Sequence, residues 1–178
     1  VLREILTQLA NTLREEGELD ERESFIDATF ASAKGGGDGI GKTRRGKGVK
    51  ILAIVDRHGL PLSVSTHAAH HHEVTLVQLS FDFYMLEAKP EHLIGDRAYD
   101  SDAILDWIAN KNATAVIPPN PRRTNARQTD WSLYKERHKI EILFGMLKHY
   151  RRVFARFDKL AYRYLAFIHF AAACILLR

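Results

Sequence analysis

Four residues in the last third of the chain have side chains that could act together on a phosphodiester. They are separated by three, four and seven residues: Tyr134, Arg137, Glu141 and Lys148. At roughly 100° per residue, this spacing puts the four side chains within about 60° of one another on a helix. Cationic side chains can contact phosphate oxygens, and a carboxylate between them can hold a divalent metal ion. The spacing therefore predicts a helix face that is kept for chemistry.

The same segment has an apolar stripe that would hold this helix against a core. Its members recur at i, i+3, i+4 and i+7: Ile140, Leu143, Phe144 and Leu147. This stripe lies roughly a quarter turn away from the polar one. We therefore expect one helix over about residues 131–155, with one face packed and the adjacent face free for chemistry.

The pattern Y-x-x-R-x-x-x-E-x-x-x-x-x-x-K resembles the signature of the DDE transposases of bacterial insertion sequences, in the subgroup named after these four residues. Residues 138–152 as a whole resemble the third catalytic block of that family. The resemblance runs from about residue 25 onward and implies an α/β fold, a ribonuclease H-like mixed sheet flanked by helices. Three strands, a helix and then alternating strands and helices are the element order of such a domain.

In that family the glutamate completes a triad with two earlier aspartates, and two positions match. Asp27 lies within the β-branched and aromatic run 25–30, and Asp96 closes a later strand. The resemblance implies that Asp27, Asp96 and Glu141 are the catalytic residues. It also implies that they hold two divalent metal ions, Mg²⁺ with Mn²⁺ as a substitute, about 3.5 to 4 Å apart.

The resemblance further implies DNA contacts and an activity. Arg137 and Lys148 would contact phosphates, and Tyr134 would position DNA near the cleaved end. The implied enzyme is a transposase that cuts double-stranded DNA at the ends of its mobile element and joins them to target DNA. It would act as a homodimer in the DNA complex. A different class of function stays open, namely an inactive or domesticated descendant that binds DNA without cutting it.

Several of these residues also have simpler structural explanations. A strand carboxylate such as Asp27 could pair with a nearby arginine or lysine. Arg137 and Glu141 fit an i, i+4 ion pair on a solvated helix face.

Other aspartates resemble candidates for the triad but have local explanations. Asp56 also closes a strand, but the turn at 57–59 accounts for an aspartate there. Beyond Asp96, either Asp100 or Ser101 suits the N-cap of the next helix.

Residues 36–43 match G-x-x-x-x-G-K-[ST], the phosphate-loop pattern of nucleotide-binding proteins. Such a loop opens onto a helix whose N-terminal amides meet the phosphates. Here Thr43 is followed by a basic glycine-rich stretch and then a β-branched strand, so we expect no nucleotide partner. We expect instead a flexible basic loop between the first two strands. Its cations could follow a DNA backbone: Lys42, Arg44, Arg45 and Lys47.

A histidine-rich cluster contains residue types that also occur in zinc sites: His67, His70, His71, His72 and Glu73. No cysteine lies nearby in the sequence. We therefore favour a solvated loop that leads into a helix.

Composition and charge agree with one nucleic-acid-binding domain. A chain of 178 residues with 46% hydrophobic residues can bury one core. The net charge of +4 is modest, but acidic residues gather in the first thirty positions and basic ones in the last third. That basic part is the expected electrostatic footprint for nucleic acid.

The expected location is the cytoplasm, without a membrane anchor. Cys174 is the one cysteine, which suits a reducing compartment. The apolar run 165–177 is interrupted by His169 and is shorter than the roughly 20 residues that a membrane span needs. We expect it to be a buried helix.

Periodicity and turn signals predict the remaining elements. Helices are expected at about 2–16, 73–81, 100–110, 131–155 and 160–177, and strands at about 25–30, 49–57, 60–68, 113–117 and ending at Asp96. Residues 1–24 are expected to be a helical lead-in, as the tail of a missing DNA-recognition region, and residues 25–178 the catalytic domain. Such transposases usually carry more chain before the first aspartate. A fragment, a split frame and a decayed copy are therefore all open.

Overall fold

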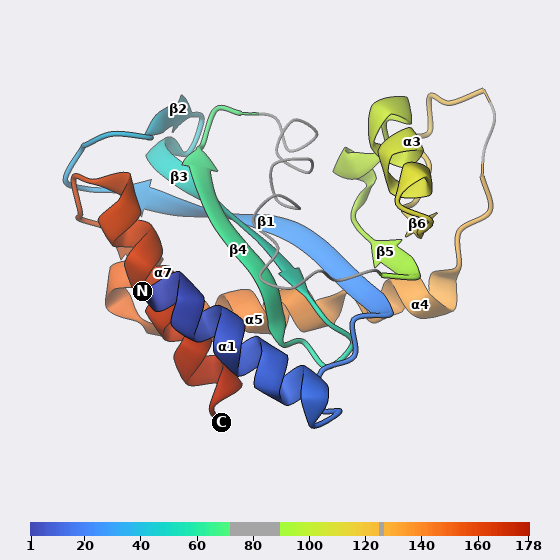
Figure 1. Cartoon of the computed structure of the whole chain (residues 1–178). Coiled ribbons are helices and arrows are strands. Elements are labelled where there is room, and N and C mark those ends of the chain that lie inside the picture. The colour runs from blue at the N-terminus through green and yellow to red at the C-terminus, as the bar shows by residue number, and fades with distance from the viewer. Residues whose placement is uncertain (72–89, 125–126) are drawn as a thin grey trace.

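The computed structural model describes residues 1–71, 90–124 and 127–178, and a mixed sheet forms its centre (Figure 1). The strands are β1 (Glu23–Ala33), β2 (Gly41–Thr43), β3 (Gly46–Val55), β4 (Pro61–Ala68), β5 (His92–Ile94), β6 (Thr114–Val116) and β7 (Ala155–Arg156). Their order is β2-β3-β1-β5-β6, with β4 beside β3 and β7 beside β1. Strands β1, β3 and β4 are antiparallel neighbours, whereas β5 and β7 run parallel to β1 and β6 runs parallel to β5. The predicted mixed sheet is confirmed.

Strand β1 is the long central element of this sheet. It pairs with β3 from Phe25 to Ser32 along one edge. Along its other edge it pairs with β5 only near its start and with β7 only at its end. The middle of β1 therefore borders the place where the chain leaves β5.

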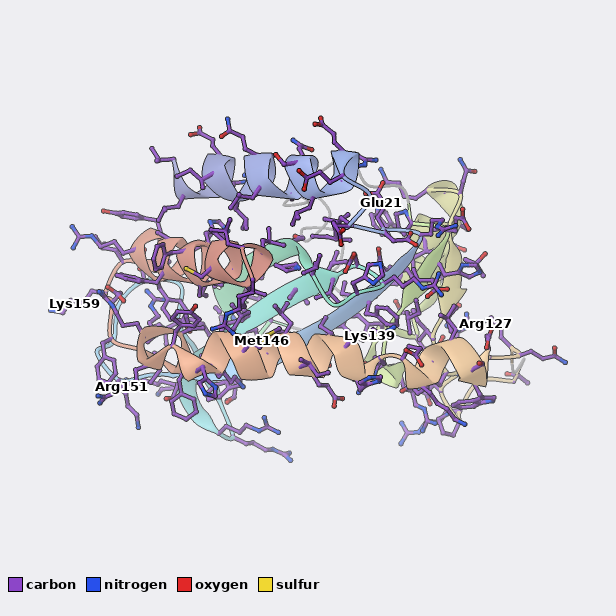
Figure 2. The ribbon with its side chains drawn as sticks, turned by 90° about the horizontal axis from the view of Figure 1, so that it is seen from below. Glu21, Arg127, Lys139, Met146, Arg151 and Lys159 are labelled. Atoms are coloured by element: carbon purple, nitrogen blue, oxygen red, sulfur yellow. The ribbon has the colours of Figure 1, made fainter. Side chains whose placement is uncertain are left out.

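Helices cover both faces of the sheet. They are α1 (Leu2–Glu15), α3 (Asp102–Asn110), α4 (Trp131–Lys135), α5 (His138–His149), α6 (Arg151–Phe154) and α7 (Ala161–Leu176), with a 3₁₀ turn, η1 (Arg97–Tyr99). Helices α5 and α7 lie on one face, with α1 alongside α7, and α3 lies on the other side of the sheet near β5 and β6 (Figures 1 and 2).

The hydrophobic core lies between the sheet and this helix layer. Strand β3 is buried over its last five residues, because apolar side chains lie on both of its faces. The apolar stripe of α5 is buried as predicted: Ile140, Leu143, Phe144 and Leu147. Burying such side chains stabilises the fold by roughly 1.5–3 kcal/mol each.

Most predicted elements are present, with ends that differ by at most three residues. The short elements β2, β7 and η1 were not predicted. The helix expected at 73–81 lies outside the described residues.

The prediction of one helix over 131–155 is wrong, because the segment forms α4, α5 and α6. Between α4 and α5, the amides of Arg137 and Ile140 bond to carbonyls three residues back, at Tyr134 and Arg137. This pattern is tighter than that of an α-helix. At Tyr150 the backbone becomes extended, with ψ 111, and this ends α5. Hydrophobic periodicity runs through both junctions and therefore does not reveal them.

The glycine-rich stretch after β1 packs against the backbone that precedes α7. A Cβ atom at Gly35 would collide with the carbonyl of Phe157, and one at Gly37 with that of Lys159. Glycine is required here because two stretches of backbone approach closely.

Asp38 fastens this stretch to the start of α7. Its carboxylate accepts hydrogen bonds from the Ala161 amide (2.6 Å) and from the buried guanidinium of Arg156 (3.0 Å). Its own amide donates to the Lys159 carbonyl (3.0 Å). The first part of the expected loop is thus docked on the protein.

The rest of the expected loop forms a hairpin. Lys42 and Thr43 belong to β2, which pairs with the start of β3. The prediction that a strand, and not a helix, follows Thr43 is confirmed. The phosphate-loop pattern therefore lacks the helix N-terminus on which phosphate binding depends.

The apolar run near the C-terminus forms most of α7 and is largely buried. Among the described residues, no helix combines the length and the hydropathy of a membrane span.

Candidate active site

Asp27 lies in the middle of β1, opposite Ala53 of β3, and its side chain is 17% exposed. One carboxylate oxygen accepts a hydrogen bond from the Ala28 amide (2.7 Å). The other accepts one from the guanidinium of Arg137 (2.7 Å). Side chains alternate between the two faces of a strand, and Asp27 points to the face that α5 covers.

Arg137 joins Asp27 to Glu141. It is the N-cap residue of α5, and its two terminal nitrogens donate separately to Asp27 (2.7 Å) and to Glu141 (2.9 Å). Glu141 is 59% exposed, whereas Arg137 is 21% exposed. The simple pairings expected from the sequence are both present, and they meet on one guanidinium. Figure 2 shows α5 crossing the face of the sheet, from Lys139 near its start to Met146.

The charge of Asp27 is poorly compensated. Burial raises the pKa of the Asp27 carboxyl, and the Ala28 amide and Arg137 offset this only in part. The negative charge of Asp96 raises the pKa further. For Arg137, burial alone would lower the pKa, but Asp27, Tyr134 and Glu141 raise it.

Asp96 lies just beyond β5, on the strand line next to Asp27. Ile94 pairs with Phe25 in parallel register, so a continuation of both chains brings Asp96 level with Asp27. The Asp96 carboxylate accepts a hydrogen bond from the Ala98 amide (2.8 Å) and caps η1. Its effect on the pKa of Asp27 agrees with this placement.

Lys148 lies against β1 near the other end of α5. Its ammonium group donates to the hydroxyl of Thr29, which shares a strand face with Asp27. Burial lowers the pKa of Lys148, and the nearby Arg45 lowers it further. Thr29 was not among the predicted site residues. Its position two residues after Asp27 was the available signal.

Tyr134 belongs to α4 and therefore to a different helix from Glu141. It is partly buried against the core and packs edge-on against Trp131, with ring centres 5.6 Å apart. The predicted single stripe is thus interrupted between Tyr134 and Arg137.

Asp100 holds the basic loop that follows β6 in place through hydrogen bonds to its backbone and side chains. Its side chain has no exposed surface. It accepts hydrogen bonds from the Asn120 amide (2.6 Å) and from the guanidinium groups of Arg123 (2.8 Å) and Arg127 (2.7 Å). Burial alone would raise the pKa of Asp100, but these three donors outweigh it and lower the pKa. In Figure 2, Arg127 marks the end of the molecule where α4 begins.

Two sequence alternatives are resolved by local hydrogen bonds. Ser101, not Asp100, caps α3 by accepting a hydrogen bond from the Ile104 amide (3.3 Å). Asp56 is fully buried and accepts hydrogen bonds from amides in the turn that follows, at His58 and Leu60. The structural explanation of Asp56 is confirmed.

Within residues 1–71, 90–124 and 127–178, no three histidine, cysteine or carboxylate side chains are grouped so that they could hold a metal ion. In the histidine-rich cluster, His67 bonds to the Ser65 hydroxyl (2.8 Å), and residues 72–73 lie outside the described part. Asp27 and Glu141 are instead bridged by the positively charged side chain of Arg137.

Comparisons with known proteins identify the family. Residues 18–176 match the family described as the transposase DDE domain. The chain is 42% identical over 130 residues to the putative transposase for insertion sequence element IS6501 of Brucella ovis, which covers 72% of this chain and 98% of that protein.

Solved structures show the fold. The piggyBac transposase in its synaptic complex with hairpin DNA matches 95% of this chain and 51% of that one, with a TM-score of 0.62 and 10% identity. The simian T-cell lymphotropic virus intasome in complex with PP2A regulatory subunit B56 gamma matches 85% of this chain and 48% of that one, with a TM-score of 0.56 and 14% identity. The chain thus spans about half the length of these solved chains. On the family match and the Brucella relative, it belongs to the transposase DDE domain family of bacterial insertion sequences, with a ribonuclease H-like fold.

Proposed function

We propose that this domain is the catalytic part of a transposase that cuts DNA at the ends of its mobile element and transfers the cut strands into target DNA. We assign it to the Y-R-E-K subgroup, with Asp27, Asp96 and Glu141 as the catalytic carboxylates. The observation that carries this proposal is the meeting of Asp27 and Glu141 on one guanidinium, next to Asp96, although they are far apart in the sequence.

Asp27, Asp96 and Glu141 offer the ligand atoms that divalent metal ions prefer, although among the described residues they are not grouped closely enough to hold an ion as they stand. Mg²⁺, with Mn²⁺ as a substitute, prefers oxygen ligands, and three carboxylates supply them. The raised pKa of Asp27 indicates a buried carboxylate that lacks enough positive charge around it. Two bound ions would activate the attacking water or 3′-hydroxyl and stabilise the leaving 3′-oxygen.

Arg137 has two proposed positions in this function. In the first it holds Asp27 and Glu141 together, as the hydrogen bonds of this structure support. In the second it has released both carboxylates to the metal ions and binds a phosphate oxygen of the DNA. A planar guanidinium suits both partners, because it binds carboxylates and phosphates in the same way.

We propose that Lys148 and Tyr134 help to position the DNA. Lys148 is anchored on Thr29, on the same strand face as Asp27, so its charge is available to a phosphate there. Tyr134 lies on α4, close enough to Arg137 to affect its pKa.

The proposed partners are double-stranded DNA, as mobile-element ends and as target, and a second copy of the chain in the DNA complex. We propose a cytoplasmic location, where the single cysteine stays reduced. Residues 1–24 are proposed as a helical lead-in to the catalytic domain at 25–178. In this structure Leu6 and Ala10 of that segment are fully buried.

One observation favours a second candidate function. Arg137 forms ion pairs with both Asp27 and Glu141, as it would in an inactive descendant that binds DNA but no metal. This candidate shares the DNA partner and differs in metal binding and cleavage.

Cleavage of the element's own ends tests the proposal. The substrate is a labelled duplex that carries the DNA ends flanking this gene in its source genome, with Mn²⁺ present. Glu141→Gln keeps the shape of the side chain but removes a metal-binding charge. We expect this variant to lose cleavage while its DNA affinity stays similar. Normal cleavage by this variant would contradict the assignment.

The matched control is Glu136→Gln. Glu136 is also exposed and also pairs with a cation, Lys139, at 2.7 Å, so its variant should cleave normally. Calorimetric titration with Mn²⁺ gives a readout that is independent of turnover, and we expect binding by the parent and its loss in Asp27→Asn. A parent chain that binds DNA but neither binds Mn²⁺ nor cleaves would support the inactive descendant.

A further inference from the structure

A basic hairpin projects from the sheet close to the proposed active site. Strand β2 pairs with the start of β3, from Gly41 opposite Gly48 to Thr43 opposite Gly46. Figure 2 shows this hairpin in pale cyan, projecting past α5. Its cations are all exposed: Lys42, Arg44, Arg45 and Lys47. Within the described part of the chain, none of the four forms an ion pair.

The charges of the hairpin repel one another. Lys42 lies directly opposite Lys47, and like charges in this position destabilise a strand pair. Arg45 also acts on Lys148 and lowers its pKa. The sequence supplies no carboxylate between Asp38 and Asp56 to relieve this repulsion. An external anion would relieve it.

The turn of the hairpin is well defined. The Thr43 hydroxyl donates to the Gly46 carbonyl (3.1 Å) and accepts from the Arg45 amide (3.1 Å). Gly46 has a φ of 101°, a conformation that favours glycine. The two turn arginines, Arg44 and Arg45, are therefore presented from a fixed base.

A cavity of about 390 Å³ connects the hairpin to β1. It is lined by Arg44 and Arg45 of the turn, by Lys50 of β3 and by Thr29 of β1. Thr29 also accepts the hydrogen bond of Lys148. Along an extended strand, Thr29 lies only about 7 Å beyond Asp27. A DNA backbone bound at Asp27 would therefore reach this cavity directly.

We propose that the β2–β3 hairpin, together with Lys148, binds the sugar-phosphate backbone of DNA next to the position that is cut. The proposal rests on the proposed function, because it takes the substrate to be DNA at Asp27. We propose contacts to the backbone and not to base edges. Because arginine and lysine can also contact guanine, the test compares two unrelated duplexes.

The salt dependence of DNA binding tests this proposal. Binding of the parent and of the double variant Arg44→Gln with Arg45→Gln is measured by fluorescence anisotropy in EDTA, from low to moderate salt, on two unrelated duplexes. Each lost phosphate contact should reduce the slope of log affinity against log salt concentration by roughly 0.9. We expect a reduction of between about one and two, equal on both duplexes.

A second double variant, Lys111→Gln with Arg178→Gln, is the matched control. It removes the same charge from the end of α3 and from the C-terminus. An unchanged slope in the hairpin variant, or an equal reduction in the control, would overturn the proposal. The measurement needs no cleavage, so its result is separable from that of the cleavage assay. A reduced slope without cleavage would leave the hairpin surface standing while the enzymatic proposal fails.

Chemical protection supplies a test that requires no variant. The unmodified protein is treated with acetic anhydride with and without duplex DNA, and acetylation of each lysine is quantified by mass spectrometry. We expect DNA to lower the reactivity of Lys42 and Lys47 severalfold while that of Lys111 stays unchanged. Equal reactivity of Lys42 and Lys47 with and without DNA would contradict the proposal even if the variants failed to fold.

Discussion

Asp100 and Asp27 both pair with arginine, and their surroundings differ in one decisive respect. Asp100 has no exposed surface and receives three donors, namely one amide and two guanidinium groups. Asp27 is also largely buried, but it receives one amide and shares its single guanidinium with Glu141. The pKa of Asp100 is lowered, whereas that of Asp27 is raised.

This difference indicates that Asp100 stabilises the fold, whereas Asp27 is available to bind a ligand. At Asp100 the donors outweigh the cost of burial, so the ion pairs stabilise the loop after β6. At Asp27 burial outweighs the donors, and the neighbouring Asp96 adds a second negative charge. A site that keeps a buried negative charge without enough positive charge around it is a candidate for function, because a bound cation would supply the missing positive charge.

The largest effect that would sharpen this comparison is expected from Asp27→Asn. Cleavage with Mn²⁺ should fall by more than the roughly 10- to 100-fold seen when an outer-shell partner of a metal site is lost. Stability should stay the same or rise slightly at neutral pH. A raised pKa means that the native state binds a proton more tightly than the unfolded chain, so the ionised carboxylate costs stability there. Cleavage rates and thermal melting check both parts, and a strongly destabilised variant would contradict the comparison.

The second effect is a loss of stability in Asp100→Asn. Removing this charge leaves Arg123 and Arg127 without their shared partner. We expect the free energy of unfolding to fall by about 2 to 3 kcal/mol. This is below the usual range for buried pairs, because the side chains that cover Asp100 are the arginines themselves. For a chain of this size the melting temperature should fall by roughly 5 to 10 °C. Asp102→Asn is the control, because Asp102 also pairs with Arg123 but is 82% exposed. Equal melting temperatures for the two variants would remove the distinction between Asp100 and its neighbour.

A smaller effect is expected from Arg137→Gln. The variant no longer places a positive charge between Asp27 and Glu141, so we expect Mn²⁺ to bind severalfold more tightly and DNA more weakly. Calorimetry and anisotropy measure the two affinities, with Arg163→Gln on α7 as the control. Weaker Mn²⁺ binding in Arg137→Gln would show that this arginine supports the metal site and does not compete for it.

The smallest expected effect is the loss of the stabilisation by Asp100 at acidic pH. Because the folded pKa of Asp100 is lowered, its stabilisation is fully present above the unfolded value of about 3.9 and is lost as pH falls through the folded pKa. The difference in melting temperature between the parent and Asp100→Asn should therefore shrink as the pH falls below about 4. Melting curves between neutral pH and pH 3 check this. A difference that grows toward acid would mean that the pKa of Asp100 is raised, as it is for Asp27.

Several parts of the fold were predictable because their signals are local. The β-branched and aromatic run 25–30 and the β-branched run 49–57 predicted two strands that pair in the structure. The stripe of Ile140, Leu143 and Leu147 predicted a buried helix face. The turn after Asp56 was also predicted, because its carboxylate bonds to amides two and four residues ahead. Its further bond to the Asp20 amide, 36 residues away, was not predictable.

Other features were not predictable, because their partners are distant in the sequence. The break between α4 and α5 changes hydrogen bonding but not the hydrophobic period. The expected flexible loop is in part a docked segment, because Asp38 binds the amide of Ala161. From its local position Asp100 was one of two candidates for a helix cap, whereas its partners come from the loop after β6.

The sequence by itself determined most of the longer helices and strands, and which residue types carry the family pattern, since both depend on spacing along a short stretch of chain. It did not reveal β2, β7 or the division of 131–154 into three helices. The tertiary structure decided how these residues are paired. The register of β1 with β5 brings Asp96 level with Asp27, and the packing of α5 on the sheet brings Arg137 to Asp27 from 110 residues away. The balance of donors around a buried carboxylate depends on such contacts, so the contrast between Asp27 and Asp100 arises only in the folded chain.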